Sequence, residues 1–121
     1  MQYLVQLQLA STTRPMTPEE GISFIEQFIF PTLERCKKLQ EAKKIIGGGP
    51  VSGAVALALI VDAESARELD DLLTSLPVWP RMETDVTPLT TFDDRFQSVM
   101  AIRAGLKAQM REITTTPGGG R

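Results

Sequence analysis

The sequence contains no histidine and only one cysteine, Cys36, among its 121 residues. The absence of histidine excludes His-based acid–base catalysis, Ser-His-Asp and Cys-His nucleophile systems, and nearly all zinc sites. A single cysteine also excludes a disulfide bond within the chain. These absences predict a protein that works without a zinc ion and without a histidine- or disulfide-based mechanism.

Long apolar runs and a strong charge bias are missing as well. The most apolar stretch, residues 53–61, is far too short to span a bilayer. The net charge is −2, and no basic patch with interleaved aromatic residues provides a footprint for nucleic acid. The N-terminus lacks the basic segment of a signal peptide. We therefore expect a soluble cytoplasmic protein without membrane or nucleic-acid partners.

The sequence does contain a regular series of strand and helix patterns. Apolar and other residues alternate along the predicted strands, whereas apolar residues recur every three or four positions along the predicted helices. The patterns predict, in chain order, strand 2–9, helix 17–39, strand 43–46, strand 54–62, helix 63–76, strand 82–89 and helix 93–111.

Several local signals support these predicted boundaries. Thr17 can cap the first helix, and Glu20 completes the capping box. Pro31 lies inside that helix and should kink it or split it in two, because it lacks the N–H and crowds the preceding turn. Asp62 is the predicted N-cap of the second helix. The run Gly47–Pro50 should end the second strand as a flexible hairpin.

The order β-α-β-β-α-β predicts an α+β fold of the ferredoxin-like type, with an antiparallel sheet and one additional C-terminal helix. We expect a single domain over residues 1–112 that includes the helix 93–111, followed by a disordered tail over residues 113–121. Such a sheet has helices on one face only. The other face needs a cover, and a second copy of the chain is the obvious one, so we expect a homodimer or a higher homo-oligomer.

The two faces of the predicted sheet differ in character. Large apolar residues such as Val5 and Leu57 should face the helices. The open face would have the alanines of strand 54–62 together with Gln6, Gln8 and a charged set from the last strand. Small alanines leave space that polar side chains can surround, which is what a small-ligand pocket needs. The alternative is that this face is solvated or packed against a partner subunit. This set consists of the charged residues Arg81, Glu83 and Asp85, together with Thr87.

Glu83 is the candidate catalytic residue, because a partly buried carboxylate on this face can act as a general base. Arg81 is the candidate for binding a substrate carboxylate through its two-pronged donor geometry. Gln6 and Gln8 would orient the ligand. The alternatives are a solvated or ion-paired Glu83, and an Arg81 that pairs with Glu83 or Asp85.

Other residues have weaker cases. Lys43 and Lys44 could place a cation near an enolate oxygen, although lysines there more often protect an edge strand. Trp79, between two prolines, could anchor a subunit contact or form a wall of the pocket. Cys36 lies on the apolar stripe of the first helix and is interpreted as a core residue. The helix 93–111 has more apolar surface than one sheet edge can bury, which indicates a subunit interface.

One segment has a specific resemblance. The stretch Ser75–Leu89 resembles the C-terminal signature of the muconolactone isomerase family, through Ser75-Leu76-Pro77, Pro80, Met82-Glu83, Val86-Thr87 and Leu89. The resemblance covers residues 1–90. It implies a ferredoxin-like fold of the dimeric α+β barrel type, oligomers with active sites between subunits and no metal, and proton transfer beside a lactone carbonyl that moves a double bond.

The sequence also departs from that family. The family's first strand has a His and an acidic residue, where this chain offers Leu4, Gln6 and Gln8, and Arg81 replaces an aromatic residue. Our hypothesis is a cofactor-free, isomerase-like or related lyase-type enzyme acting on a lactone or a carboxylated cyclic metabolite. The alternatives are a non-catalytic oligomer that binds a small ligand, and a purely structural oligomer.

Overall fold

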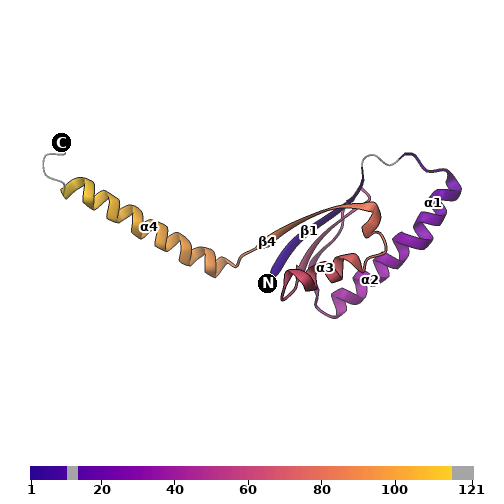
Figure 1. The fold of residues 1–121 in the computed structure, drawn as a ribbon, viewed down its shortest axis with the longest axis horizontal. Coiled ribbons are helices and arrows are strands. Elements are labelled where there is room, and N and C mark those ends of the chain that lie inside the picture. Colours follow the sequence, from indigo (N-terminus) through magenta and orange to yellow (C-terminus); the bar gives the residue numbers. More distant parts are fainter. Residues whose placement is uncertain (11–13, 116–121) are drawn as a thin grey trace. The chain divides into compact units, whose positions relative to one another are not determined.

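The computed structural model of the protein describes residues 1–10 and 14–115. The chain divides into two compact units, Met1–Leu89 and a second unit that begins at Thr90. The elements of the first unit are β1 (Gln2–Leu9), α1 (Pro18–Phe24), the π-helical turn η1 (Ile25–Ile29), α2 (Phe30–Glu41), β2 (Ile45–Pro50), β3 (Ala56–Asp62), α3 (Ala66–Thr74), the 3₁₀ turn η2 (Trp79–Arg81) and β4 (Met82–Leu89) (Figure 1).

The four strands form one antiparallel sheet in the order β2-β3-β1-β4. This confirms the predicted α+β class and the strand order of a ferredoxin-like fold. Because β1 pairs with both β3 and β4, it lies at the centre, where Gln6 is opposite Ala58 on one side and Asp85 on the other. Helices α1, α2 and α3 lie on one side of the sheet (Figure 1).

The core fills the space between the sheet and these helices. Val5, Leu7 and Val61 are fully buried on the helix side of the sheet, and Leu69 and Leu72 of α3 pack against the same cluster. These strand residues have the period of two that the sequence predicted for the covered face. The hydrophobic effect therefore fixes which face of each strand the helices cover.

The first long helix is interrupted where Pro31 was predicted to disturb it, and the interruption is a π-helical turn. The Thr17 side chain accepts a hydrogen bond from the Glu20 N–H, and the Glu20 side chain accepts one from the Thr17 N–H, so the capping box is present. Further along, the Phe30 N–H donates to the Ile25 carbonyl, five residues back. Pro31 cannot donate such a bond, and the wider π turn before it relieves the crowding of its ring.

The second strand differs from its prediction. It runs from Ile45 to Pro50, so the glycine run lies inside the strand and does not form a flexible hairpin. The strand contains an irregularity in pairing between Ile45 and Gly47, and Gly48 has a φ of 87°. Glycine adopts this left-handed backbone without the clash that a Cβ atom would cause, and glycines in strands commonly mark such bulges.

The remaining boundaries agree more closely. Strand β4 has the predicted bounds, and β3 begins two residues later than expected. Helix α3 is shorter than predicted, and its N-cap is Ser65 rather than Asp62, because the Ser65 hydroxyl accepts the hydrogen bond from the Glu68 N–H. Asp62 instead forms an ion pair with the N-terminal amine of Met1.

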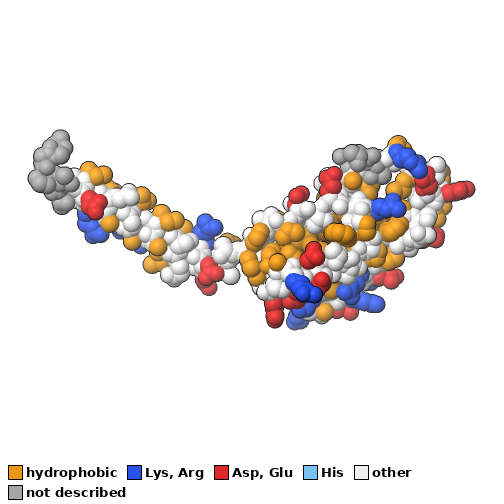
Figure 2. Space-filling view, in the orientation of Figure 1, with side chains coloured by type: hydrophobic (Ala, Val, Ile, Leu, Met, Phe, Trp, Pro, Cys, Tyr) orange, Lys and Arg blue, Asp and Glu red, His pale blue; other side chains and the backbone are white. Residues whose placement is uncertain are grey.

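In the second unit the described structure is a single helix, α4 (Phe92–Thr115). This helix is longer than the predicted helix 93–111. Residues 113–115, which were expected to belong to the disordered tail, are helical. Residues 116–121 of the predicted tail lie outside the described residues. Apolar side chains are exposed along α4 (Figure 2). Within the described residues, no helix is both long and apolar enough to cross a membrane.

Gly48 gives a direct test of the strand geometry. A Cβ atom at Gly48 would lie 2.0 Å from the carbonyl oxygen of Ala58, whereas one at Gly49 would meet nothing within 4 Å. We predict that Gly48→Ala lowers the free energy of unfolding by about 2–4 kcal/mol, since it combines backbone strain with a clash. The matched control Gly49→Ala should change it by about 0.5 kcal/mol or less. Urea denaturation measures both, and equal losses would contradict the geometry of β2.

Candidate functional site

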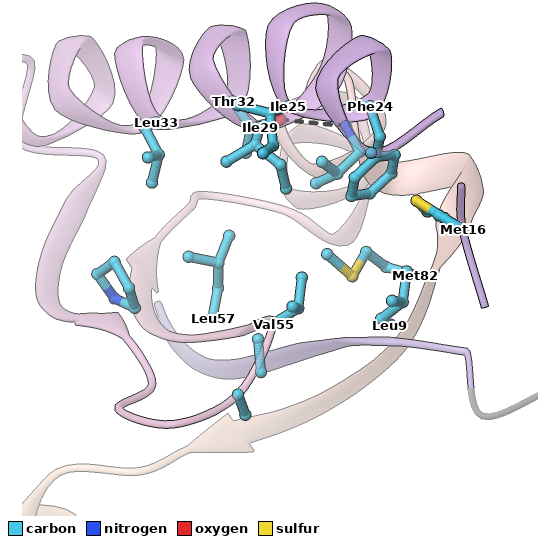
Figure 3. A pocket seen from close by; sticks show the side chains of 15 residues that line it. Leu9, Met16, Phe24, Ile25, Ile29, Thr32, Leu33, Val55, Leu57 and Met82 are labelled. Carbon is cyan, nitrogen blue, oxygen red and sulfur yellow. Dashed lines mark hydrogen bonds between the residues drawn. The ribbon is translucent and has the colours of Figure 1, made fainter. Parts of the chain in front are cut away.

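An apolar cavity of about 480 Å³ lies between the first helices and one end of the sheet (Figure 3). Side chains from α1, η1 and α2 form one wall, and residues at the ends of β1, β3 and β4 form the other. The helical wall includes Phe24, Ile25, Ile29 and Leu33, and the opposite wall includes Leu9, Val55, Leu57 and Met82. Such a volume lies within the range of small-molecule sites.

Thr32 has the only side-chain oxygen or nitrogen among the described residues that line this cavity. Its side chain is buried, and its hydroxyl oxygen accepts a hydrogen bond of 3.1 Å from the backbone N–H of Val78 (Figure 3). This bond satisfies a donor in the turn before β4, which would otherwise be costly to bury. It ties the helical wall to the segment that leads into β4.

A second, polar hollow of about 390 Å³ adjoins the apolar cavity, since both are lined by Met16 and Phe24. Its other lining residues are Glu19, Glu20, Ser23, Gln27, Phe28 and Arg81. The guanidinium carbon of Arg81 lies 5.0 Å from the centre of the Phe28 ring, which is a cation–π contact. Together the two hollows offer an apolar body and a polar end.

The two carboxylates of the polar hollow are in different situations. Glu20 accepts hydrogen bonds from the Arg14 guanidinium and from the Thr17 N–H. The Arg14 hydrogen bonds, followed by the Thr17 N–H, lower the pKa of Glu20 to about 2. Glu20 is therefore held as an anion and is a poor proton carrier near neutral pH. The side chain of Glu19 makes no hydrogen bond or ion pair with the residues that the structure describes.

The sequence-predicted site residues divide between two sides of the sheet. Glu83 is exposed on the open face, where it is the cross-strand partner of Gln8, and Gln6 lies beside Asp85 on the same face. Arg81 was expected on that face too, and this expectation is wrong, because its guanidinium lies over Phe28 on the helix side. Arg81 belongs to the 3₁₀ turn η2, so the strand alternation does not extend to it.

The position of the cavity also differs from the prediction. The pocket was expected on the open, alanine-lined face, yet the apolar cavity lies on the helix-covered side. Ala54 and Ala56 do reach its rim, but Gln6, Gln8 and Glu83 line neither hollow. The prediction assumed that small residues would leave space on the open face. In the structure the space lies between the helical segment that contains the π turn and the end of the sheet.

Three further candidates lie away from both hollows. The Lys44 amine is 2.8 Å from a carboxylate oxygen of Glu68, which raises the pKa of Lys44 through that hydrogen bond. Trp79 is part of η2 and is partly exposed. Cys36 packs against the core, and burial raises the pKa of its thiol, so it is no activated nucleophile.

Sequence reasoning missed the helical wall of the cavity. The signal was present, because the segment Ile22–Leu33 has more apolar residues than one buried stripe requires. Ile25 and Leu33 belong to this apolar segment, and both remain exposed enough to line the cavity. A helix that is apolar on two sides indicates a second apolar surface beside the core.

The fold and the hollows define a class: an antiparallel, ferredoxin-like α+β domain with an apolar cavity between its helices and its sheet. The family model described as "Muconolactone delta-isomerase" matches residues 1–95, and the chain belongs to that family. Most of α4 lies beyond the matched residues.

A solved structure agrees with this assignment at the level of the fold. The crystal structure of muconolactone isomerase at 3.3 Å resolution matches with a TM-score of 0.59 and 22% sequence identity. The match covers 75% of this chain and 90% of that one. A search among curated proteins finds no match.

The low pKa of Glu20 predicts a specific dependence of stability on pH. Because the folded-state pKa is about 2 rather than the usual 4.5, the stabilisation is present above about pH 4.5 and is lost as the pH falls towards 2. We predict that the stability difference between wild type and Glu20→Gln shrinks steadily over this range. Glu19→Gln is the matched control. Thermal unfolding from pH 6 to pH 2 measures the difference, and a constant difference would contradict this role of Glu20.

Proposed function

We propose that the protein is an isomerase-like enzyme that takes a small lactone or carboxylated cyclic metabolite into the apolar cavity. The observation on which this proposal rests is that an apolar cavity adjoins a polar hollow that contains Arg81. Membership of the muconolactone delta-isomerase family supports the reaction class. In that chemistry a proton leaves a carbon beside a carbonyl group and returns elsewhere, and a double bond moves.

Arg81 is the proposed anchor for the substrate's carboxylate. Its guanidinium makes no hydrogen bond or ion pair with the described residues, so its N–H donors are available to a ligand. The contact with Phe28 holds the planar group at one place in the hollow. A carboxylate there would receive two parallel hydrogen bonds, while the ring of the substrate lies against Phe24 and Met82.

The proton-transfer group is a carboxylate in this proposal, and the geometry offers two. Glu19 lines the polar hollow together with Arg81, and in this proposal the ligand's carboxylate binds in the same hollow. Glu83 follows Met82 in β4, and neighbouring strand residues point to opposite faces. A ligand in the cavity would therefore not meet Glu83 of the same chain. A catalytic Glu83 requires a ligand on the open face, beside Gln6 and Gln8, and closed by a second copy of the chain.

Non-catalytic binding is the second candidate function. It is favoured by the lining of the apolar cavity itself, in which no described side chain is ionisable. In this case the cavity would hold the ligand, and Arg81 would select for a negative charge without any chemistry. Both candidate functions predict the same class of ligand, but only the enzyme would exchange a proton of the ligand with solvent.

Gly21 allows the cavity to be blocked without harming the fold. Gly21 lines the cavity from α1, and a Cβ atom there would meet nothing within 4 Å. We predict that Gly21→Leu abolishes ligand binding and turnover, while stability stays the same or rises by up to about 1 kcal/mol, because leucine favours a helix more than glycine does. The matched control is Gly105→Leu in α4, which has similar free space.

The readouts are muconolactone binding by calorimetry and deuterium incorporation from D₂O by NMR. Normal binding and turnover in Gly21→Leu would contradict the cavity as the site. Saturable binding by wild type without deuterium incorporation, across muconolactone and related lactones, would favour the binding module.

Three further variants separate the roles of the polar residues. Arg81→Ala should raise KM or Kd by roughly 10- to 150-fold, the effect of losing charge-assisted hydrogen bonds. Glu19→Gln should lower kcat by about 100-fold or more if it transfers the proton, while Glu83→Gln leaves kcat unchanged. The opposite pattern, with turnover lost only in Glu83→Gln, would place the chemistry on the open face.

A further inference from the structure

Helix α4 presents an apolar seam that the proposed ligand site does not use. Its exposed apolar residues recur at intervals of four and three: Phe92, Phe96, Val99, Leu106, Met110 and Ile113. Arg103 occupies the one position at which this series is interrupted. Figure 2 shows apolar side chains, in orange, along α4.

The spacing of the seam is that of a coiled coil. Alternating steps of four and three residues give a mean period of 3.5, and this period keeps an apolar stripe facing a partner helix. Over the three heptads of α4 the stripe holds mostly large apolar side chains. Most of the stability of helices in proteins comes from packing such an apolar face. The seam therefore indicates a helical partner of matching period.

We propose that α4 pairs with α4 of a second copy of the chain in an antiparallel coiled coil. The seam and the charge complementarity described next support this pairing, which is independent of the ligand proposed for the cavity. With Val99 opposite Arg103 of the second copy, the flanking positions place Asp93 beside Lys107 of the other helix. The symmetry of the pair produces this contact twice.

Parallel pairing lacks this complementarity. In a parallel pair, Arg103 would lie opposite Arg103 of the second copy inside the seam, which places two like charges together. The flanking positions would set Arg95 beside Met100 and Ile102 beside Lys107, without an opposite charge for either cation. The antiparallel arrangement instead sets Met100 against Met100 and Ile102 against Ile102, so these exposed apolar residues are also covered.

The seam is tested with a charge placed inside it and the same charge placed outside it. We expect Leu106→Glu to raise the dissociation constant of the full-length assembly by about 100-fold or more, since the charge would be buried in an apolar layer. Ala101→Glu, on the face opposite the seam, is the matched control and should leave the constant within about threefold. Sedimentation equilibrium measures both. A monomeric wild type, or equal assembly of wild type and Leu106→Glu, would overturn the proposal.

The orientation is tested by disulfide formation between two variants in a Cys36→Ser background. Full-length chains with Asp93→Cys are mixed with chains that have Lys107→Cys, and the mixture is oxidised. The antiparallel pair predicts a cross-link between the two different variants. In a parallel pair these positions would be separated by about 21 Å along the axis, given the 1.5 Å rise per residue. Cross-links formed only between copies of the same variant would overturn the antiparallel arrangement.

Discussion

The first unit depends on the register of its central strand, β1. This strand pairs with β3 from Gln2 to Gln8 and with β4 from Gln2 to Leu9, so its alignment decides which face the side chains of all three strands lie on. A slip by one residue would exchange the two faces and would expose Val5 and Leu7, which are now fully buried. The same register turns Met82 towards the cavity and Glu83 away from it. Because Met82 and Glu83 lie on opposite faces, a ligand in the cavity would contact Met82 but not Glu83 of the same chain.

The cavity arises from the way the helical wall meets this sheet. The π turn before Pro31 runs from Ile25 to Ile29, and both of these residues line the cavity. The buried bond from the Val78 N–H to the Thr32 hydroxyl then fixes the wall to the turn that leads into β4. This turn also places Arg81 against Phe28, on the helix side. Wide turns of this kind are frequent at functional sites, and here one lies in the cavity wall.

Much of the fold could be predicted from the sequence, because it follows from local periodicity. The alternation in β1 and β4 and the capping box at Thr17 gave correct elements, and the family signature at Ser75–Leu89 lies within the segment matched by the family model. The second strand was misjudged, because glycines usually end strands, and the pairing of Gly48 with β3 was visible only in three dimensions.

The site was harder to predict than the fold. Alternation placed Glu83 and Gln8 correctly on the open face, but it failed for Arg81, which precedes the strand in a 3₁₀ turn. The position of the cavity depends on how the helical wall packs against the end of the sheet, and the periodicity of the sequence contains no information about that packing. The seam of α4 is a property of the sequence alone, but its meaning depends on the continuous helix that extends to Thr115.

The central claim is that a small ligand binds between the helices and the sheet, and methyl NMR during a titration with muconolactone tests it most directly. The account predicts shifts for the methyl groups of Leu9, Ile29 and Met82, which line the cavity. Leu4, Ala58 and Ile60, on the open face, should stay unchanged. Shifts confined to the open-face methyl groups would contradict this claim and would place the ligand site on the open face, beside Glu83.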